Sequence, residues 1–289
     1  MSKVAIISDI HDWHSNQIEY FLKKNNVKTS KITFEELVFS FKNNKVFFKN
    51  NKLLNDINGI WVRFLKAGTL EEITTKLTIL HLLKEMKIYI HNSASVIEKT
   101  VDKVRTTGIL ELNGINTPET TVWFEKKKFN FNFKQNKKYL IKPIFGSQGK
   151  NIVLVKNPNL LKKQKITGEV FYLQEFIESS GDKFNDIRVF VSNHKILSSM
   201  ERVSDHFITN IYQGAKSRKI SLGNKIEEIC KKISRIFKLG YGGIDIKIFE
   251  EKIYVLEVNS IPSWKMIQKT TKKNISEILV EDFIKNLRK

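Results

Sequence analysis

Three oxygen-bearing side chains near the C-terminus have the types and spacing of a magnesium site. Glu257 and Asn259 are two residues apart in an apolar stretch, so a β-strand would direct both to one face. A three-residue loop at 250–252 would place Asp245, from the preceding apolar stretch, directly opposite Glu257. Facing carboxylates repel each other unless a cation neutralises them, and Mg²⁺ prefers such oxygen ligands. Because the flanking residues are apolar, we predict a metal site here rather than a solvent-facing acidic hairpin.

A glycine-containing loop could lie over the phosphates of a nucleotide. Between two predicted strands the chain carries Gly146, Ser147, Gln148 and Gly149, followed by Asn151. Glycine lets backbone N–H groups approach a phosphate closely, and asparagine adopts positive φ nearly as readily. The loop does not open a helix, so it is not a P-loop. Taken alone, the segment indicates only a hairpin turn.

Four cationic residues could complete a nucleotide site together with these two groups. They are Lys103, Lys142, Arg188 and Arg202. None is informative alone, because the chain has 50 lysines and arginines. With a glycine loop and an acidic triad, however, they supply the positive groups that a triphosphate requires.

The formal net charge of +20 raises the alternative of a basic nucleic-acid-binding protein. Only seven of the 50 basic residues are arginines, whose forked side chains are the usual readers of nucleic-acid sequence. The lysines are spread through the chain beside abundant Asn, Ile and Phe, which is the joint excess that AT-rich codons produce. A nucleic-acid binder would show steeply salt-dependent affinity without ATP turnover, and it would leave the acidic triad unexplained. Nucleic acid is therefore not the expected partner.

The elements that must position these residues alternate between strands and helices over about the first 92 residues, which predicts a small α/β domain. A helix from Ser95 to Asn113 follows, because Ser95 and Glu98 have the spacing of a capping box. Three short strands then predict an antiparallel sheet, and a third block carries further strands, a helix at 224–238, the acidic hairpin and a final helix at 274–287. We predict an N-terminal domain at 1–92, a central unit at 93–172 and a C-terminal unit at 173–289.

The cellular setting and one rival function follow from single residues. Cys230 is the only cysteine and the first apolar run is short, so we expect a cytoplasmic protein without disulfides or a membrane span. Asp9 and His11 follow the first strand, as in the first metal motif of metallophosphoesterases. That chemistry also requires a closing His-x-His pair, which the six histidines do not form. We therefore reject this rival.

The motifs together resemble the ATP-grasp superfamily, and within it the RimK-type amino-acid ligases, over nearly the whole chain. The resemblance rests on short segments in a fixed order: 92–103, 141–149, 174–177, 186–188, 243–245 and 257–262. Further segments at 12–14, 63–71, 202–206, 209–211 and 213–215 look most similar to the α-L-glutamate ligase branch that acts on tetrahydromethanopterin. Two positions depart from the family pattern, namely Asn151 in place of a glycine and Ser263 in place of a glycine or alanine.

This resemblance implies a nucleotide clamped between two small α+β subdomains behind a small α/β domain. The adenine of ATP would lie against a hinge formed by Gln174, Glu175, Phe176 and Ile177. Lys103 and Lys142 would contact the phosphates, with the residues from Gly146 through Ser147 and Gln148 to Gly149 folded over them. Asp245, Glu257 and Asn259 would hold one or two Mg²⁺ ions, for which Mn²⁺ could substitute.

The resemblance also implies an ATP-dependent carboxylate–amine ligase that works through an acyl phosphate. Arg202 and Arg188 would stabilise the tetrahedral intermediate, and Asn210, Trp13, His14 and Arg63 would contact the substrates. L-glutamate would be added to a carboxylate acceptor, expected to be a pterin-type cofactor such as tetrahydromethanopterin. A protein or an amino-acid carrier as acceptor stays open, as does a homo-oligomeric state.

Overall fold

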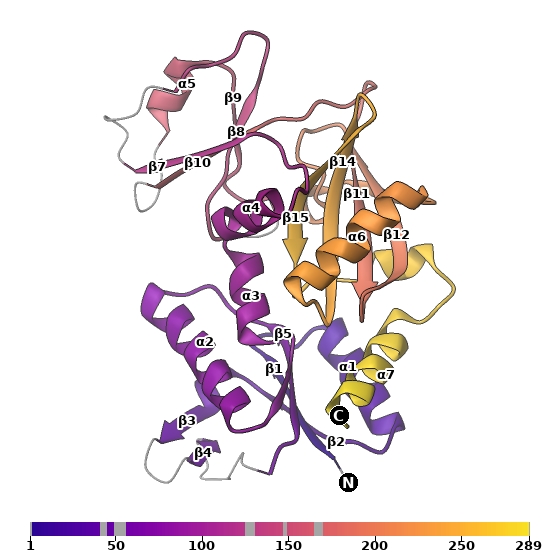
Figure 1. Ribbon diagram of the computed structural model, residues 1–289. Coiled ribbons are helices and arrows are strands. Elements are labelled where there is room, and N and C mark those ends of the chain that lie inside the picture. Colours follow the sequence, from indigo (N-terminus) through magenta and orange to yellow (C-terminus); the bar gives the residue numbers. More distant parts are fainter. Residues whose placement is uncertain are drawn as a thin grey trace.

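The computed structural model describes residues 2–40, 45–48, 56–124, 131–146, 149–164 and 170–288. Ser147 and Gln148, both expected to cover phosphate, lie outside these residues. The described residues form three main sheets and one two-stranded ribbon. In Figure 1 the N-terminal sheet lies below, the central sheet at the upper left and the C-terminal sheet at the upper right.

The N-terminal sheet is parallel, with the strand order β2-β1-β5-β6. Its strands are β1 (Lys3–Ser8), β2 (Lys28–Ile32), β5 (Gly59–Phe64) and β6 (Tyr89–His91). Around it lie α1 (Trp13–Lys24), η1 (Phe34–Glu36), α2 (Leu70–Glu85) and the ribbon of β3 (Leu37–Ser40) and β4 (Lys45–Phe48). Parallel strands need crossover connections, and helices supply them here. The alternating pattern of strand and helix is therefore realised as expected.

Asp9, the first residue of the rejected metallophosphoesterase motif, organises the loops at the end of β1. Its carboxylate accepts hydrogen bonds from the backbone N–H groups of Phe34 at 3.3 Å and Lys66 at 2.7 Å. The Lys76 ammonium lies 3.4 Å from the same carboxylate. These contacts give Asp9 a structural role in the N-terminal unit.

The last helix of the chain, α7 (Ile275–Leu287), lies beside α1 of the N-terminal unit, as Figure 1 shows, and it also contacts β6. Phe283 and Leu279 of α7 share an apolar core with Ile18 of α1, Val4 of β1 and Trp264. The predicted C-terminal unit at 173–289 therefore returns to the N-terminal sheet. This return fixes the segment between β15 and α7 beside the first domain.

The predicted single helix at 95–113 is wrong, because the chain forms two helices, α3 (Ala94–Val101) and α4 (Lys103–Leu112). Ser95 lies inside α3 and does not cap it. Asp102 leaves the helical conformation with ψ of 108° and accepts a hydrogen bond from the Arg105 backbone N–H. A side-chain cap of this kind starts a new helix. The break therefore makes Lys103 the first residue of α4.

The central sheet is antiparallel, with the order β7-β10-β8-β9. Its strands are β7 (Thr120–Phe124), β10 (Val170–Glu175), β8 (Tyr139–Ile141) and β9 (Val153–Val155), and α5 (Pro158–Lys163) follows β9. The predicted boundary between residues 172 and 173 falls inside β10. Since β10 pairs on both sides within this sheet, we propose that the boundary lies after it.

The C-terminal sheet has five antiparallel strands in the order β13-β12-β11-β14-β15. They are β11 (Phe184–Ser192), β12 (Lys195–Ser204), β13 (Lys216–Lys219), β14 (Tyr241–Phe249) and β15 (Lys252–Asn259). The helix α6 (Asn224–Phe237) covers one face, and its Cys230, Ile233 and Phe237 are fully buried against that face. The short helices η4 (Ile211–Gln213) and η5 (Ile267–Thr270) lie in the connections. The opposite face is left for the ionic side chains described below.

The acidic hairpin has the predicted pairing but not the predicted loop. Glu250 and Glu251 form a two-residue turn with φ of 48° and 60°, and Phe249 pairs with Lys252. A two-residue turn with both φ values positive suits the twist of a hairpin. A register shift between Asp245 and Ile246 then moves the pairing by one residue. The bulge compensates for the shorter loop, so Asp245 still pairs with Glu257.

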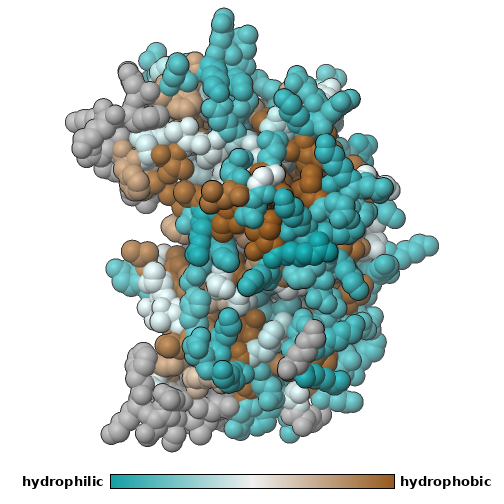
Figure 2. Space-filling model, viewed as in Figure 1, coloured by the Kyte–Doolittle hydropathy of each residue, from teal (hydrophilic) through white to brown (hydrophobic). Residues whose placement is uncertain are grey.

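Figure 2 shows a face of the molecule that is mostly polar. Hydrophilic side chains cover parts of all three sheet regions, and apolar side chains gather near the middle. The same view shows a hollow at the left, between the central sheet region above and the N-terminal region below. Within the described residues, no helix combines the length and apolarity needed to cross a bilayer.

Candidate active site

A row of buried charged side chains crosses the C-terminal sheet on the face opposite α6. Strand pairing places Arg188 opposite Asp245 and Asp186 opposite Arg202. Arg188 binds both carboxylate oxygens of Asp245 at 2.7 Å, and Arg202 binds Asp186 with two bonds of 2.6 and 2.5 Å. Arg202 also reaches Asp245 at 2.9 Å. Because antiparallel partners lie directly opposite each other, the four side chains form one continuous network.

The charges in this network fix one another's protonation states. Burial would raise the pKa of Asp245, but the adjacent guanidinium groups of Arg188 and Arg202 outweigh burial and lower its pKa to about 2. Burial would lower the pKa of Arg202, yet Asp186 and Asp245 raise it above its ordinary value. Opposite charges at hydrogen-bond distance favour the ionised form of each group. Asp245 is therefore a carboxylate and Arg202 a cation at neutral pH.

Glu257 and Asn259 extend this row, and their side-chain oxygens remain available to bind a cation. Both are half-buried on β15, and in the part of the chain that the structure describes neither side chain makes a hydrogen bond or an ion pair. Asp245 pairs with Glu257, and a carboxylate retains lone pairs after accepting the bonds that Asp245 accepts. The described residues contain no group of three or more His, Cys, Asp and Glu suited to a metal. Two carboxylates and an amide oxygen are the kind of donor set that fits Mg²⁺ with bound phosphate and water.

Lys142 directly follows β8, and its ammonium interacts electrostatically with Glu257 and Asp245 of the acidic row. Its ammonium donates to the Gln174 side-chain oxygen at 2.6 Å. Burial and the nearby Lys103 ammonium lower the pKa of Lys142 to about 8, although the Glu257 and Asp245 carboxylates counteract them. The predicted proximity of Lys142 to the acidic pair is therefore present in the structure.

A cleft runs beside Lys142 between the two sheets. The residues that line it come from the predicted hinge, from β8, β11, β14 and β15, and from the segment before η4: Leu140, Lys142, Gln174, Glu175, Phe176, Ile177, Phe184, Asn185, Asp186, Phe207, Thr209, Lys247 and Leu256. All four hinge residues expected against adenine are among them. The Gln174 amide is held by donating to the hydroxyls of Thr120 at 3.0 Å and Tyr172 at 2.9 Å. The cleft therefore joins the hinge to the charged row.

Three residues of this cleft were missed by the sequence reading. Lys247 donates to the backbone oxygen of Asn185 at 2.6 Å, and Thr209 donates to Asp186 at 2.6 Å. Burial lowers the pKa of Lys247 to about 8. Asp186 and Thr209 lie within the family-like segments 186–188 and 209–211, but neither was expected to have a role of its own, although Asp186 binds Arg202 directly. Strand alternation could have found Lys247, because it lies two residues after Asp245 on β14 and so shares its face.

The glycine loop contacts both α4 and the segment around η4. Lys103 donates through its ammonium to the Gly146 carbonyl at 3.0 Å. Gly149 has φ of +70°, and a Cβ there would lie 2.7 Å from the Ile208 side chain. Asn151 has φ of +59°, which agrees with the conformation expected for it. The helix break at residue 102 thus brings Lys103 to the loop that follows Lys142.

Asn210, expected to contact the acceptor, begins η4. Its side-chain oxygen accepts a hydrogen bond from the Tyr212 backbone N–H at 2.9 Å. It lies close to the glycine loop, since a Cβ at Gly149 would be 3.8 Å from the Asn210 Cβ. The structure therefore gives Asn210 a capping role at the loop, and its contact with a substrate stays a prediction.

His14 and Arg63, also expected at the substrate, form a buried cluster with Asp12. Arg63 donates to Asp12 at 2.8 Å, and the His14 Nδ1 lies 2.8 Å from the same carboxylate. The His14 Nε2 faces the backbone N–H groups of Trp264 and Lys265 at 3.1 and 3.3 Å, so it acts as their acceptor. Burial lowers the pKa of His14, which keeps the ring neutral. The cluster therefore anchors the 263–265 segment to the N-terminal unit.

This anchored segment lies directly after the acidic strand and beside the arginines. Pro262 packs over Gly243, where a Cβ would lie 3.3 Å from the proline and 3.6 Å from Arg188 Nε. The Ser263 hydroxyl donates to His14 Nε2 at 2.9 Å. Trp13 packs edge-on against Trp264 at 6.5 Å between ring centroids. His14, Arg63 and Trp13 thus support the chain that borders Arg188, whereas direct substrate contact by them remains a prediction.

Comparison with known proteins shows the family to which this chain belongs. The model of the RimK-like ATP-grasp domain matches residues 100–283. The chain belongs to the RimK-like ATP-grasp family. It is 29% identical to the tetrahydromethanopterin:alpha-L-glutamate ligase of Methanococcus maripaludis, with 97% of each chain covered. It is 32% identical to the protein of the same name from Methanocaldococcus jannaschii, with 71% of this chain and 74% of the relative covered.

Solved structures of ATP-grasp ligases share the fold over the full length of the chain. The ligase PsnB in complex with a precursor variant, Mg and ADP superposes with a TM-score of 0.73 at 14% identity, covering 98% of both chains. The D-alanine–D-alanine ligase of Bacillus anthracis in complex with ATP gives 0.71 at 16% identity. These findings confirm the predicted ATP-grasp fold, the RimK-type family and a ligase that forms carbon–nitrogen bonds.

Proposed function

We propose that this ligase adds L-glutamate to a carboxylate of a pterin-type cofactor such as tetrahydromethanopterin. The observation that carries the chemistry is the row of Asp245, Glu257 and Asn259 facing Lys142 beside the hinge cleft. The choice of acceptor rests on the full-length similarity to a ligase named for it. We further propose that the enzyme acts in the cytoplasm.

The chain's own side chains account for each step of this reaction. Lys142 and Lys103 attract the phosphates of ATP, and Gly149 lets the loop close over them. Asp245, Glu257 and Asn259 would hold one or two Mg²⁺ ions, which when bound neutralise phosphate charge; Mn²⁺ could replace them. The acceptor carboxylate attacks the γ-phosphorus and ADP leaves, giving an acyl phosphate.

The second half of the reaction forms the amide. The amine of L-glutamate attacks the acyl carbon, gives up a proton and displaces inorganic phosphate. Negative charge develops on the acyl oxygen in the tetrahedral intermediate. Arg188 and Arg202 are already fixed by their carboxylate partners, so they stabilise that charge without reorganising. Asn210, beside the glycine loop, would position the acceptor.

A second acceptor is favoured by one specific similarity. The chain is 30% identical to a coenzyme gamma-F420-2:alpha-L-glutamate ligase of Methanococcus maripaludis. The match covers 67% of this chain and 71% of that relative. That relative is named for a different cofactor and for the same amino acid. Coenzyme gamma-F420-2 is therefore the first alternative acceptor, and a protein or an amino-acid carrier is the next.

The test measures ADP release with ATP, Mg²⁺ and L-glutamate across these acceptors, and mass spectrometry identifies the product. We expect release to be stimulated by tetrahydromethanopterin, with a product heavier by one glutamyl residue. Asp245→Asn should reduce the rate at least about 100-fold, as loss of a preorganised charge at the reacting phosphate does. Asp182→Asn, in an exposed loop, is the matched control. If no acceptor in the panel is extended, the proposed substrate is wrong.

A further inference from the structure

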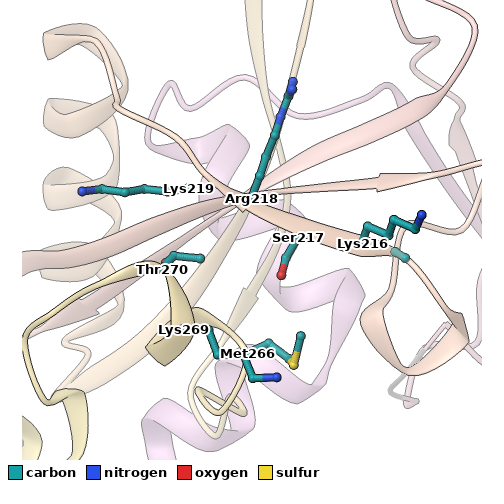
Figure 3. A pocket seen from close by; sticks show the side chains of 8 residues that line it. Lys216, Ser217, Arg218, Lys219, Met266, Lys269 and Thr270 are labelled. Atoms are coloured by element: carbon teal, nitrogen blue, oxygen red, sulfur yellow. The ribbon is translucent and has the colours of Figure 1, made fainter.

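A basic groove lies on the far side of the arginine row from the nucleotide cleft. It has a volume of about 690 Å³ and lies between the edge strand β13 and the η5 segment. Figure 3 shows its lining: Ala215, Lys216, Ser217, Arg218, Lys219, Met266, Lys269 and Thr270. It shares no lining residue with the cleft beside Lys142. The groove is therefore a separate site of a size typical for small-molecule ligands.

Strand pairing places this groove next to the reaction centre. Ser217 of β13 is the register partner of Arg202, and Lys219 is the partner of Met200. Ser217 and Lys219 therefore share the sheet face that carries Arg202, one strand spacing away. In Figure 3 Arg218 points away from Met266, and its guanidinium binds Glu201 on the other face. The groove therefore lies one strand away from Arg202 on the same sheet face, although Arg202 is not part of its lining.

Three lysines of the groove carry positive charge that no acidic side chain neutralises. Lys216, Lys219 and Lys269 are exposed, and among the described residues none of them forms an ion pair with a carboxylate. The lining includes no aspartate or glutamate. Met266 and Ala215 add apolar surface between the lysines. A ligand that matches this surface has several anionic groups and an apolar part.

We infer that the groove binds the anionic part of the acceptor, whose reactive carboxylate extends from β13 along this sheet face to the arginine row. This inference rests on the proposed function, because it assigns the acceptor of the same reaction. The groove would recognise several anionic groups, either carboxylates or phosphates, within one small molecule. Lys219 comes from the β13 wall of the groove and Lys269 from the η5 wall, and they bind these groups while ATP occupies the other cleft.

Charge reversal of the two walls tests the inference by kinetics. In Lys219→Glu and in Lys269→Glu we expect the KM for tetrahydromethanopterin to rise at least about tenfold, because each variant loses one charge-assisted hydrogen bond to the acceptor. The KM for ATP and the kcat should stay within about twofold. Lys225→Glu on α6 makes the same charge change on an exposed site outside the groove and is the control. Circular dichroism and thermal midpoints verify that each variant is folded.

Equilibrium binding separates this inference from the proposed function. Calorimetry uses the ATP- and Mg²⁺-saturated enzyme with triglutamate in one arm and inorganic phosphate in the other. Binding of either probe that is lost in Lys219→Glu supports the groove and identifies which anion it takes, even if no acceptor is turned over. Turnover of the pterin with the same KM in both variants as in Lys225→Glu overturns the groove and leaves the function standing. Failure of both probes to bind, with kinetics unchanged, also overturns it.

Discussion

The charge of Lys142 sets a pH limit on the use of ATP. Its pKa is lowered to about 8, because burial and the Lys103 ammonium together outweigh the acidic pair. The side chain is a cation below that pH and becomes neutral above it. A neutral amine attracts phosphate far less than an ammonium does. We therefore expect ATP capture by the free enzyme to weaken as the pH rises through about 8.

The size of the effect follows from the titration. One unit above the pKa, at about pH 9, about one tenth of the Lys142 side chains remain protonated. The value of kcat/KM for ATP reports the free enzyme, so it should fall about tenfold between pH 7 and about pH 9. The kcat should change less, because bound phosphate favours the protonated amine.

Two variants decide whether Lys142 is the responsible group. Lys142→Arg carries a guanidinium whose charge persists throughout this range, so the decline above about pH 8 should disappear even if the rate is lower. Lys142→Met lacks the charge at every pH and should be slow throughout. ADP release at subsaturating ATP, measured in overlapping buffers, gives the profiles. An unchanged decline in Lys142→Arg would refute the reasoning.

Three further outcomes follow from individual contacts. Burial lowers the pKa of His91 from 6.5 to about 3, so the unfolded chain binds a proton before the folded chain does as the pH falls below 6.5. Protonation of His91 in the unfolded chain should therefore remove about 3 kcal/mol of the free energy of unfolding by about pH 4.5. Urea titrations measure this loss, and a flat profile would contradict it. Gly240→Ala should cost about 1–3 kcal/mol in the same titration, because its Cβ would lie 2.3 Å from His91 Cε1. Gly149→Ala, with φ of +70° and a Cβ 2.7 Å from Ile208, should raise the KM for ATP several-fold, whereas Gly181→Ala, with open space around it, should not.

The acidic hairpin shows how far local pattern reaches. Asp245 and Glu257 were predicted to face each other, and they do, although the loop has two residues rather than three. The prediction survived because a bulge between the loop and the site restores the register. Alternation alone fixes that Glu257 and Asn259 share a face, whereas the bulge depends on packing that no short window of sequence contains.

The N-terminal cluster shows where local pattern fails. Trp13 and His14 were expected at the substrate only through resemblance, and Ser95 with Glu98 predicted a cap that does not form. In the structure Glu98 binds His81 at 2.8 Å, while the ring of His14 holds backbone groups about 250 residues further along the chain. Such contacts depend on which surfaces meet after folding.

The amino-acid sequence by itself determined the order of strands and helices, the face of the hairpin that carries its oxygens, and the motifs that identify the family. These properties depend on residues close together in the chain, whose geometry is set by backbone periodicity. Only the tertiary structure decided that Arg188 and Arg202 share Asp245, that α7 returns to the first sheet, and that a lysine-lined groove opens beside the arginines. Those arrangements join segments far apart in sequence, and the free energy of burying charge and apolar surface selects them only once the whole chain is packed.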